Sequence, residues 1–239
     1  MIIDTIYNTN CLGDSGMCII PDKSIDMILC DLPYGTTACK WDTIIPFPAL
    51  WDQYTRIIKD PGVIALTASQ PFTSKVVMSN PKLFRYEYIW QKEQGTNYLN
   101  ANKQPLKVHE NVLIFYNKQP VYNQQLTPGK PYITGNGDSG EVTRSRKKVI
   151  NVNHGTRKPT SILKYNRQRG LHPTQKPVQL FEYLIKTYTN EGGVVLDNCM
   201  GSGTTAIACI NTNRHYIGFE QDSKYYDIIL NRITEHKRI

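Results

Sequence analysis

The sequence lacks long apolar runs, closely paired cysteines and internal repeats, and each absence excludes a class of protein. No run of about 18 apolar residues occurs in the 239 residues, so we do not expect a membrane-spanning helix. The chain opens without a basic segment followed by a long apolar one, so a secretory signal is not expected either. None of the six cysteines forms a C-x-x-C pair, which argues against a zinc or other metal site. Unpaired cysteines without a signal favour a reducing, cytoplasmic setting.

The chain does have an excess of positive charge, and that excess is local. With 28 Lys and Arg against 20 Asp and Glu, the formal net charge is +8 at pH 7. Residues 118–170 alone carry +9, and the remainder of the chain carries −1. Such a segment is either a solvated loop or a surface that binds a polyanion, and the charge alone does not decide between them.

Strand-like and helix-like segments alternate on both sides of the basic segment. We predict strands over 26–30, 63–67, 86–90, 112–116, 193–197 and 216–220, and helices over 49–59, from about 72, from 177, after 203 and from about 224. This alternation predicts an α/β fold in which residues 1–117 and 171–239 together form one domain, with 118–170 as a loop-rich basic insert.

A glycine-rich turn follows the strand predicted at 193–197. Gly201-x-Gly203-x-x-Ala206 between a strand and a helix is typical of nucleotide binding, because glycine lets the backbone approach a ligand closely. Glu220 lies 19 positions after Gly201, where a carboxylate can accept hydrogen bonds from ribose hydroxyls. The pattern fits either a dinucleotide or an adenosine ligand without phosphate. Only 19 residues follow Glu220, too few for the second half of a dinucleotide domain, and the turn lacks the P-loop lysine.

A second turn, Asp31–Tyr34 (DLPY), ends the strand predicted at 26–30. The Asp31 carboxylate and the Leu32 carbonyl could each accept one hydrogen of an exocyclic amine, which localises the nitrogen lone pair for attack. Pro33 stiffens the turn, and Tyr34 offers a face on which an extruded base could stack. By itself, the pattern also fits an ordinary turn that ends a strand.

Taken together and in order, these motifs resemble those of the β-class DNA amino-methyltransferases, which methylate adenine N6 or cytosine N4. Asp31–Tyr34 resembles their (D/N/S)PPY motif, with Leu32 where the family usually has proline. The other similar segments are 10–14 (NCLGD), 109–115 (HENVLIF), 172–177 (HPTQKP), 195–205 (VLDNCMGSGTT) and 219–220 (FE).

The resemblance implies a Rossmann-like S-adenosylmethionine-dependent methyltransferase fold, circularly permuted, with a mixed sheet and helices on both faces. It implies transfer of the methyl group of S-adenosyl-L-methionine to the N6 amine of a flipped adenine in a specific double-stranded DNA sequence. Aspartate at the first motif position favours adenine. A cytosine-N4 enzyme and a non-catalytic DNA-binding relative stay open as alternatives.

The same resemblance assigns roles to individual residues. The catalytic turn is Asp31, Leu32, Pro33 and Tyr34. Asp14 is expected to contact the adenine amine of the cofactor, and Glu220 its ribose. Thr174 and Lys176 are expected near its methionine carboxylate. The remaining cofactor contacts are expected from the glycine turn, namely from Asp197, Gly201, Ser202, Gly203 and Thr204. DNA contacts are expected among Arg144, Arg146, Lys147, Lys148, Arg157 and Lys158. The expected partner is double-stranded DNA, with a homodimer and a cognate restriction endonuclease as further candidates, in a bacterial or phage-encoded setting without a membrane.

Overall fold

The computed structural model describes residues 2–37, 39, 42–135, 150–168, 170–171 and 174–238. The chain divides into two compact units, which are described separately. Unit 1 comprises Met1–Asn123 and Ser161–Ile239, and unit 2 comprises Gln124–Thr160.

Unit 1 is built on an eight-stranded sheet in the order β1-β12-β11-β2-β3-β5-β4-β10. Within it, β5 runs antiparallel to both of its neighbours and all the other pairs are parallel. The strands are β1 (Thr5–Tyr7), β2 (Ile25–Cys30), β3 (Ile58–Ala68), β4 (Phe84–Thr96), β5 (Lys107–Phe115), β10 (Ile162–Lys164), β11 (Val194–Asp197) and β12 (His215–Phe219). The predicted α/β class with a mixed sheet is confirmed. The circular permutation stays a prediction.

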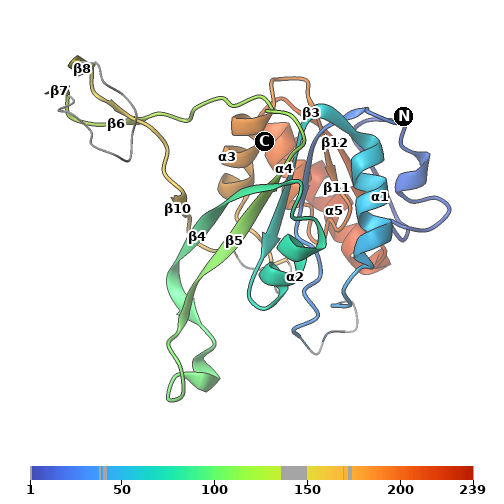
Figure 1. Ribbon diagram of the computed structural model, residues 1–239. Coiled ribbons are helices and arrows are strands. Elements are labelled where there is room, and N and C mark those ends of the chain that lie inside the picture. Colours follow the sequence, from blue (N-terminus) through green and yellow to red (C-terminus); the bar gives the residue numbers. More distant parts are fainter. Residues whose placement is uncertain are drawn as a thin grey trace. The chain divides into compact units, whose positions relative to one another are not determined.

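Helices cover both faces of this sheet (Figure 1). On one face α3 (Val178–Tyr188), α4 (Thr204–Asn211) and α5 (Ser223–His236) pack over the sheet, and on the other lie α1 (Phe47–Ile57) and α2 (Phe72–Ser79). Two short 3-10 turns, η1 (Met17–Ile19) and η2 (Tyr98–Asn100), complete the unit. Among the described residues, no helix is long and apolar enough to cross a membrane.

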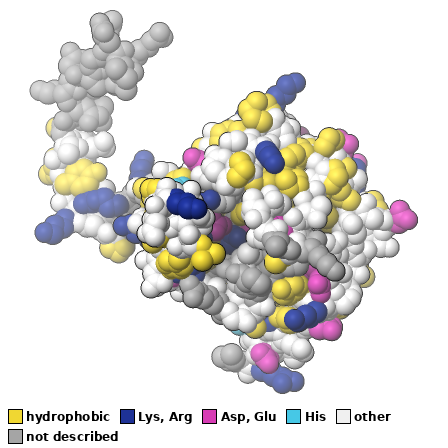
Figure 2. Space-filling view, turned by 90° about the horizontal axis from the view of Figure 1, so that it is seen from below, with side chains coloured by type: hydrophobic (Ala, Val, Ile, Leu, Met, Phe, Trp, Pro, Cys, Tyr) yellow, Lys and Arg dark blue, Asp and Glu magenta, His cyan; other side chains and the backbone are white. Residues whose placement is uncertain are grey.

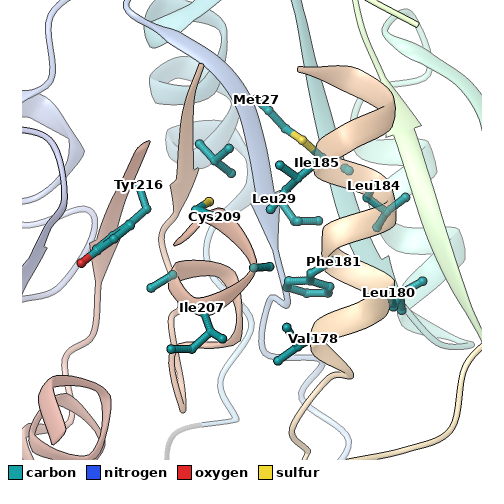
Figure 3. Packing of buried hydrophobic residues seen from close by; sticks show 14 of the residues in the cluster. Met27, Leu29, Val178, Leu180, Phe181, Leu184, Ile185, Ile207, Cys209 and Tyr216 are labelled. Carbon is teal, nitrogen blue, oxygen red and sulfur yellow. The ribbon is translucent and has the colours of Figure 1, made fainter. Parts of the chain in front are cut away.

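The central strand β2 shows why two layers of helices are needed. Met27 and Leu29 point to the α3 and α4 face, where they meet Phe181 and Ile185 (Figure 3). Ile28, between them, belongs to the cluster on the α1 and α2 face. Because side chains alternate across a strand, an apolar run such as that of β2 buries both faces at once.

Two local features differ from the sequence prediction. The helix expected over 49–59 ends at Ile57, and Ile58 already pairs with Ile25 of β2. Pro61 disfavours helical conformation only at Asp60, so the pairing of Ile58 with β2 accounts for the earlier end. The second feature is β10, which lies in the segment expected to be loop and pairs in parallel with β4.

Unit 2 contains two small antiparallel pairs. β6 (Thr127–Pro128) pairs with β9 (Thr156–Arg157), and β7 (Tyr132–Gly135) pairs with β8 (Ile150–Asn153). The Arg157 guanidinium lies 4.8 Å from the centre of the Tyr132 ring and donates to the Lys130 carbonyl at 2.6 Å. These contacts link β9 to β7, because the apolar side chains of β7 and β8 are exposed and bury little surface.

Candidate active site

The two turns singled out from the sequence lie at the same edge of the sheet. Asp31 follows β2, Asp197 ends β11 and Glu220 follows β12. These three strands are parallel neighbours, with Leu196 opposite both Ile28 and Ile217. Their carboxyl ends therefore meet at one edge, which is where open α/β sheets bind ligands.

A single cavity of about 550 Å³ joins the two turns. Such a volume suits a ligand of cofactor size. The predicted residues that line it are Asp31, Leu32, Pro33, Tyr34, Thr174, Lys176, Asp197, Gly201, Ser202, Thr204 and Glu220. The structure thus brings together eleven of the thirteen residues expected to act on the amine or to bind the cofactor.

The Asp31 carboxylate is held by hydrogen bonds from three elements. The Tyr34 hydroxyl donates to Oδ1 over 3.0 Å, and the Thr67 hydroxyl at the end of β3 donates to the same oxygen. The Lys176 ammonium donates to Oδ2 over 2.6 Å. Because both oxygens are bound, the orientation of the carboxylate is fixed before any ligand arrives.

Glu110 belongs to the same cluster, although the motif that contains it suggested no role for it. Its Oε2 lies 3.4 Å from the Lys176 ammonium, and its Oε1 lies 2.5 Å from that of Lys92. Burial opposes the ionisation of Glu110, but the two ammonium groups outweigh burial and lower its pKa to about 2. Glu110 is therefore a fixed negative charge at neutral pH.

The antiparallel direction of β5 explains why Glu110 reaches this edge. β3 ends at Ala68, which pairs with Asn111, so Glu110 lies one residue beyond the end of β3. In β4, Trp90 pairs with Glu110, and Lys92 lies two residues further along. Sequence analysis missed these residues because only strand pairing brings Thr67 to Asp31 and the pair of Glu110 and Lys92 to Lys176.

Lys176, which the resemblance places near the methionine carboxylate, lines the cavity. Its ammonium contacts Asp31 and Glu110. Burial lowers the pKa of Lys176, but the two carboxylates outweigh that effect and its pKa is raised. Lys176 is therefore a charged ammonium, only 5% exposed, whose two carboxylate contacts link the segment before α3 to the ends of β2 and β5.

Tyr34 is held from two sides. Its ring stacks on Phe72 with the ring centres 4.9 Å apart, and the Lys176 ammonium lies 5.6 Å from the ring centre. Burial, together with the charges of Asp31 and Glu110, raises the pKa of Tyr34 well above its ordinary value. Tyr34 is accordingly a neutral donor to the Asp31 carboxylate.

Asp42 closes the loop that follows the catalytic turn, and sequence analysis did not identify it. Its carboxylate accepts the backbone N–H groups of Gly35, Thr36 and Thr37 at 2.7–2.8 Å. Burial opposes ionisation, but these hydrogen bonds outweigh it and lower the Asp42 pKa. These hydrogen bonds hold the backbone of residues 35–37 to Asp42 beside the cavity.

The glycine turn is fixed through Glu220. Gly201 has a φ of 54°, and its N–H donates to Glu220 Oε2 over 2.8 Å. The Asp222 N–H donates to Oε1 over 2.9 Å. A carboxylate has about four lone-pair sites, so Glu220 keeps acceptor capacity toward the cavity.

Gly203 begins α4 and has a φ of 78°, which favours glycine. It is not among the residues that line the cavity. A Cβ at this position would come within 2.7 Å of Ile229 on α5, so the glycine also allows α4 and α5 to pack closely.

Asp197 is buried beneath the glycine turn. It accepts hydrogen bonds from the Thr205 hydroxyl at 2.5 Å and from the Cys199 N–H at 3.0 Å. Burial outweighs these bonds and raises the pKa of Asp197 to about 6. Both contacts hold the glycine turn to the end of β11.

The remaining predicted residues lie elsewhere. Asp14 is exposed and is not among the cavity residues, although nearby Asn10, Cys11 and Leu12 are. Arg157 and Lys158 belong to unit 2. Arg144, Arg146, Lys147 and Lys148 lie outside the described residues.

Comparison with known families decides where this site belongs. The family model described as DNA methylase matches residues 25–231, which include both turns and the cavity edge of the sheet. The chain belongs to this DNA methylase family. The predicted family is thereby confirmed.

Several characterised proteins are similar to this DNA methylase over most of their length. The type II methyltransferase M.HindIII of Haemophilus influenzae is 26% identical, covering 99% of this chain and 97% of the relative. The DNA adenine methyltransferase YhdJ of Escherichia coli is 28% identical, covering 90% and 78%.

Solved structures with the same fold include a complex with SAM and a methyltransferase titled by its target base. M1.HpyAVI, crystallised in complex with SAM, is 22% identical with a TM-score of 0.64, covering 95% of this chain and 98% of that one. The PvuII DNA methyltransferase, titled as cytosine-N4-specific, is 15% identical with a TM-score of 0.69, covering 97% and 90%. These likenesses show that the DNA methylase shares its fold with both.

Proposed function

We propose that this DNA methylase transfers the methyl group of S-adenosylmethionine to the exocyclic N6 amine of an adenine in a specific double-stranded DNA sequence. The observation that carries the proposal is the shared cavity. One space of about 550 Å³ is lined by the amine-accepting turn around Asp31 and by the glycine turn beside Glu220. A methyl donor and an amine acceptor must meet in just such a space.

The residues around the glycine turn fit S-adenosylmethionine. Glu220 retains acceptor capacity suited to ribose hydroxyls, and the turn over 198–205 contains no lysine or arginine that would call for a phosphate. Lys176 is the one basic residue among the described cavity residues, and Asp31 and Glu110 already bind it. When bound, the cofactor supplies an electrophilic methyl group on a sulfonium. The residues proposed to hold it are Gly201, Ser202, Thr204, Asp197 and Glu220.

On the acceptor side, the catalytic turn binds and orients the amine. The Asp31 carboxylate and the Leu32 carbonyl each accept one amino hydrogen, so that the nitrogen lone pair points to the cofactor side of the cavity. As the new C–N bond forms, the methyl C–S bond would break and leave a neutral thioether. Positive charge develops on the nitrogen, and the Asp31 carboxylate stabilises it until one amino proton is lost to solvent. Hydrogen bonds from Tyr34, Thr67 and Lys176 keep the carboxylate in position, so little reorganisation is needed during the reaction.

The choice of adenine over cytosine rests on aspartate at position 31, which the family resemblance associates with adenine N6. YhdJ, named as a DNA adenine methyltransferase, agrees with this choice. Cytosine N4 is the second candidate, because the fold is equally that of the cytosine-N4-specific PvuII enzyme. The basic segment 118–170 would bind the DNA phosphates, and the type II names of the relatives support a cognate restriction endonuclease as a partner.

One experiment tests the reaction and the base together. The purified protein is incubated with unmethylated plasmid DNA and S-adenosylmethionine that carries an isotopically labelled methyl group. The DNA is then digested to nucleosides for mass spectrometry, and a second sample is sequenced to map the methylated site. We expect label in N6-methyl-2′-deoxyadenosine, and methylation at one short sequence. Label in N4-methylcytosine would overturn the adenine assignment, and unlabelled DNA would overturn the enzyme assignment.

Replacing Asp31 with alanine tests the role of the catalytic turn. Because the charge on the nitrogen then loses its stabilising carboxylate, we expect the transfer rate to fall by roughly 10²-fold or more. Binding of S-adenosylmethionine, measured by calorimetry, should stay within a few-fold of the unchanged protein. Asp52→Ala, at an exposed aspartate on α1, is the matched control and should leave both quantities unchanged. An active Asp31→Ala protein would refute the mechanism.

A further inference from the structure

The β4–β5 hairpin extends away from the body of unit 1 (Figure 1). Residues 97–106, which connect the two strands and include η2, are called the hairpin tip. Figure 2, which looks from below onto the end where the hairpin projects, shows hydrophobic side chains beside lysine and arginine side chains. No function described above uses the hairpin tip.

The hairpin tip exposes large apolar side chains on an ordered turn. Leu99 is 99% exposed and Tyr98 is 60% exposed, whereas a leucine is among the residues most often buried in proteins. The turn holds its shape through its own hydrogen bonds. Asn97, at a φ of 70°, accepts the Asn100 backbone N–H at 3.1 Å and its side-chain amide at 2.8 Å, and Gln104 N–H donates to the Asn100 carbonyl. Leu99 is thus presented to the solvent by a structured support.

The base of the hairpin is part of the candidate active site. Lys92 of β4 and Glu110 of β5 form an ion pair across the hairpin, and Glu110 also contacts Lys176. From Glu110 to Lys107, three residues of strand span about 10 Å. The hairpin tip therefore begins about 10 Å from Glu110. This distance is comparable with the width of the B-DNA major groove, about 12 Å.

The charge around the hairpin tip suits a polyanion. Residues 94–108 contain two lysines, Lys103 and Lys107, and no acidic residue. If two copies of this chain met through their hairpin tips, these lysines would find no acidic residue on the opposing tip. An apolar point flanked by lysines and attached to the active site matches duplex DNA better, because phosphates attract the lysines and stacked bases accept an apolar side chain.

We propose that the hairpin tip enters duplex DNA beside the target base and that Leu99 fills the gap left when that base turns out toward Asp31. Extruding a base costs a few kcal/mol of stacking and pairing, and an apolar side chain placed in the gap recovers part of that cost. Leu99 is thus a positioning residue for the target base, and the inference rests on the proposed function.

The test compares two substrates that differ only in the cost of extrusion. One is a 30-base-pair duplex that carries the methylated sequence mapped in the experiment above, at a length chosen on the order of a few helical turns. The other is the same duplex with an abasic site opposite the target base, which leaves that base unpaired. Leu99→Ala is assayed for methyl transfer on both, with Leu230→Ala as control, because Leu230 is 42% exposed on α5.

We expect Leu99→Ala to slow transfer on the paired duplex by roughly tenfold or more, the factor expected for losing one buried leucine contact. On the abasic duplex its rate should be close to that of the unchanged protein, and Leu99→Met should be close to it on both. Equal rates of Leu99→Ala and the unchanged protein on the paired duplex would overturn the proposal. An equal slowing of transfer on both duplexes would also overturn it. If the sedimentation coefficient of Leu99→Ala then differed from that of the unchanged protein, the hairpin tip would be assigned to contact between copies. Absence of transfer by the unchanged protein would instead refute the proposed function.

Discussion

Replacing Lys176 with methionine removes the ammonium that contacts both Asp31 and Glu110 and keeps an unbranched side chain of similar length. The side chains involved are 5%, 21% and 15% exposed, so water cannot readily take the place of the ammonium. Removing one partner from a buried ion pair costs about 3–5 kcal/mol. The fall in the Glu110 pKa from 4.5 to about 2 corresponds to a stabilisation of about 3 kcal/mol. Lys176 and Lys92 both contribute to this stabilisation. We therefore expect Lys176→Met to lower the free energy of unfolding by about 3 kcal/mol at pH 7.

The pH dependence of this loss has a definite sign. The pKa of Glu110 is lower in the folded protein than in the unfolded chain, so its stabilising contribution is complete above pH 4.5 and disappears as the pH falls toward 2. Without Lys176 the folded pKa of Glu110 rises, and less stability remains to be lost. The difference between the two proteins should therefore be largest near neutral pH and should shrink as the pH falls below 4.5.

Urea unfolding, followed by circular dichroism at several pH values, measures both effects. Combining Lys176→Met with Glu110→Gln in a double-mutant cycle isolates the pair, and we expect a coupling energy of at least about 1 kcal/mol. Lys23→Met is the control. Lys23 pairs with Asp60 at 3.1 Å, but both side chains are about half exposed, so its loss should cost less than about 1 kcal/mol. A Lys176→Met protein as stable as the Lys23→Met protein, or additive effects of Lys176→Met and Glu110→Gln, would refute the buried-cluster argument.

Three further predictions concern the glycine turn and the basic segment. Gly203→Ala should destabilise the protein by about 2–4 kcal/mol in urea unfolding, because it combines a strained φ with a Cβ only 2.7 Å from Ile229. Gly192→Ala has a similar φ of 75° but open space around it, and should cost only the backbone strain, about 1 kcal/mol. In the unchanged protein the free energy of unfolding should fall as the pH rises from 4 to 6, because the raised pKa of Asp197 favours its protonated form in the folded state. Asp197→Asn should remove this fall, and an unchanged pH profile would contradict the prediction. Neutralising four basic residues of the insert should weaken DNA binding and reduce the slope of log K against log salt by up to about 3.6, whereas an unchanged slope in a filter-binding titration would assign them to a solvated loop. Those residues are Arg144, Arg146, Lys147 and Lys148.

The two turns could be predicted from the sequence because their signals are local. Proline and glycine after an apolar run end a strand wherever it lies, and a glycine pair before an apolar helix forms a close-approach turn. The alternation of strands and helices was enough to predict the α/β class, since each element is specified by its own periodicity. The structure confirms that class, and both turns line one cavity.

The charged cluster around Asp31 could not be predicted in this way. Lys176 lies 145 positions from Asp31 in the chain, and Glu110 reaches the site only because β5 runs antiparallel to β3. Strand direction and register follow from pairing between distant segments, which single-sequence periodicity does not record. The sequence by itself therefore determined most of the elements of unit 1, both turns and the location of the basic charge. Only the tertiary structure decided that Lys176 binds the Asp31 carboxylate and that Leu99 is exposed, because contact and burial depend on which elements pack together.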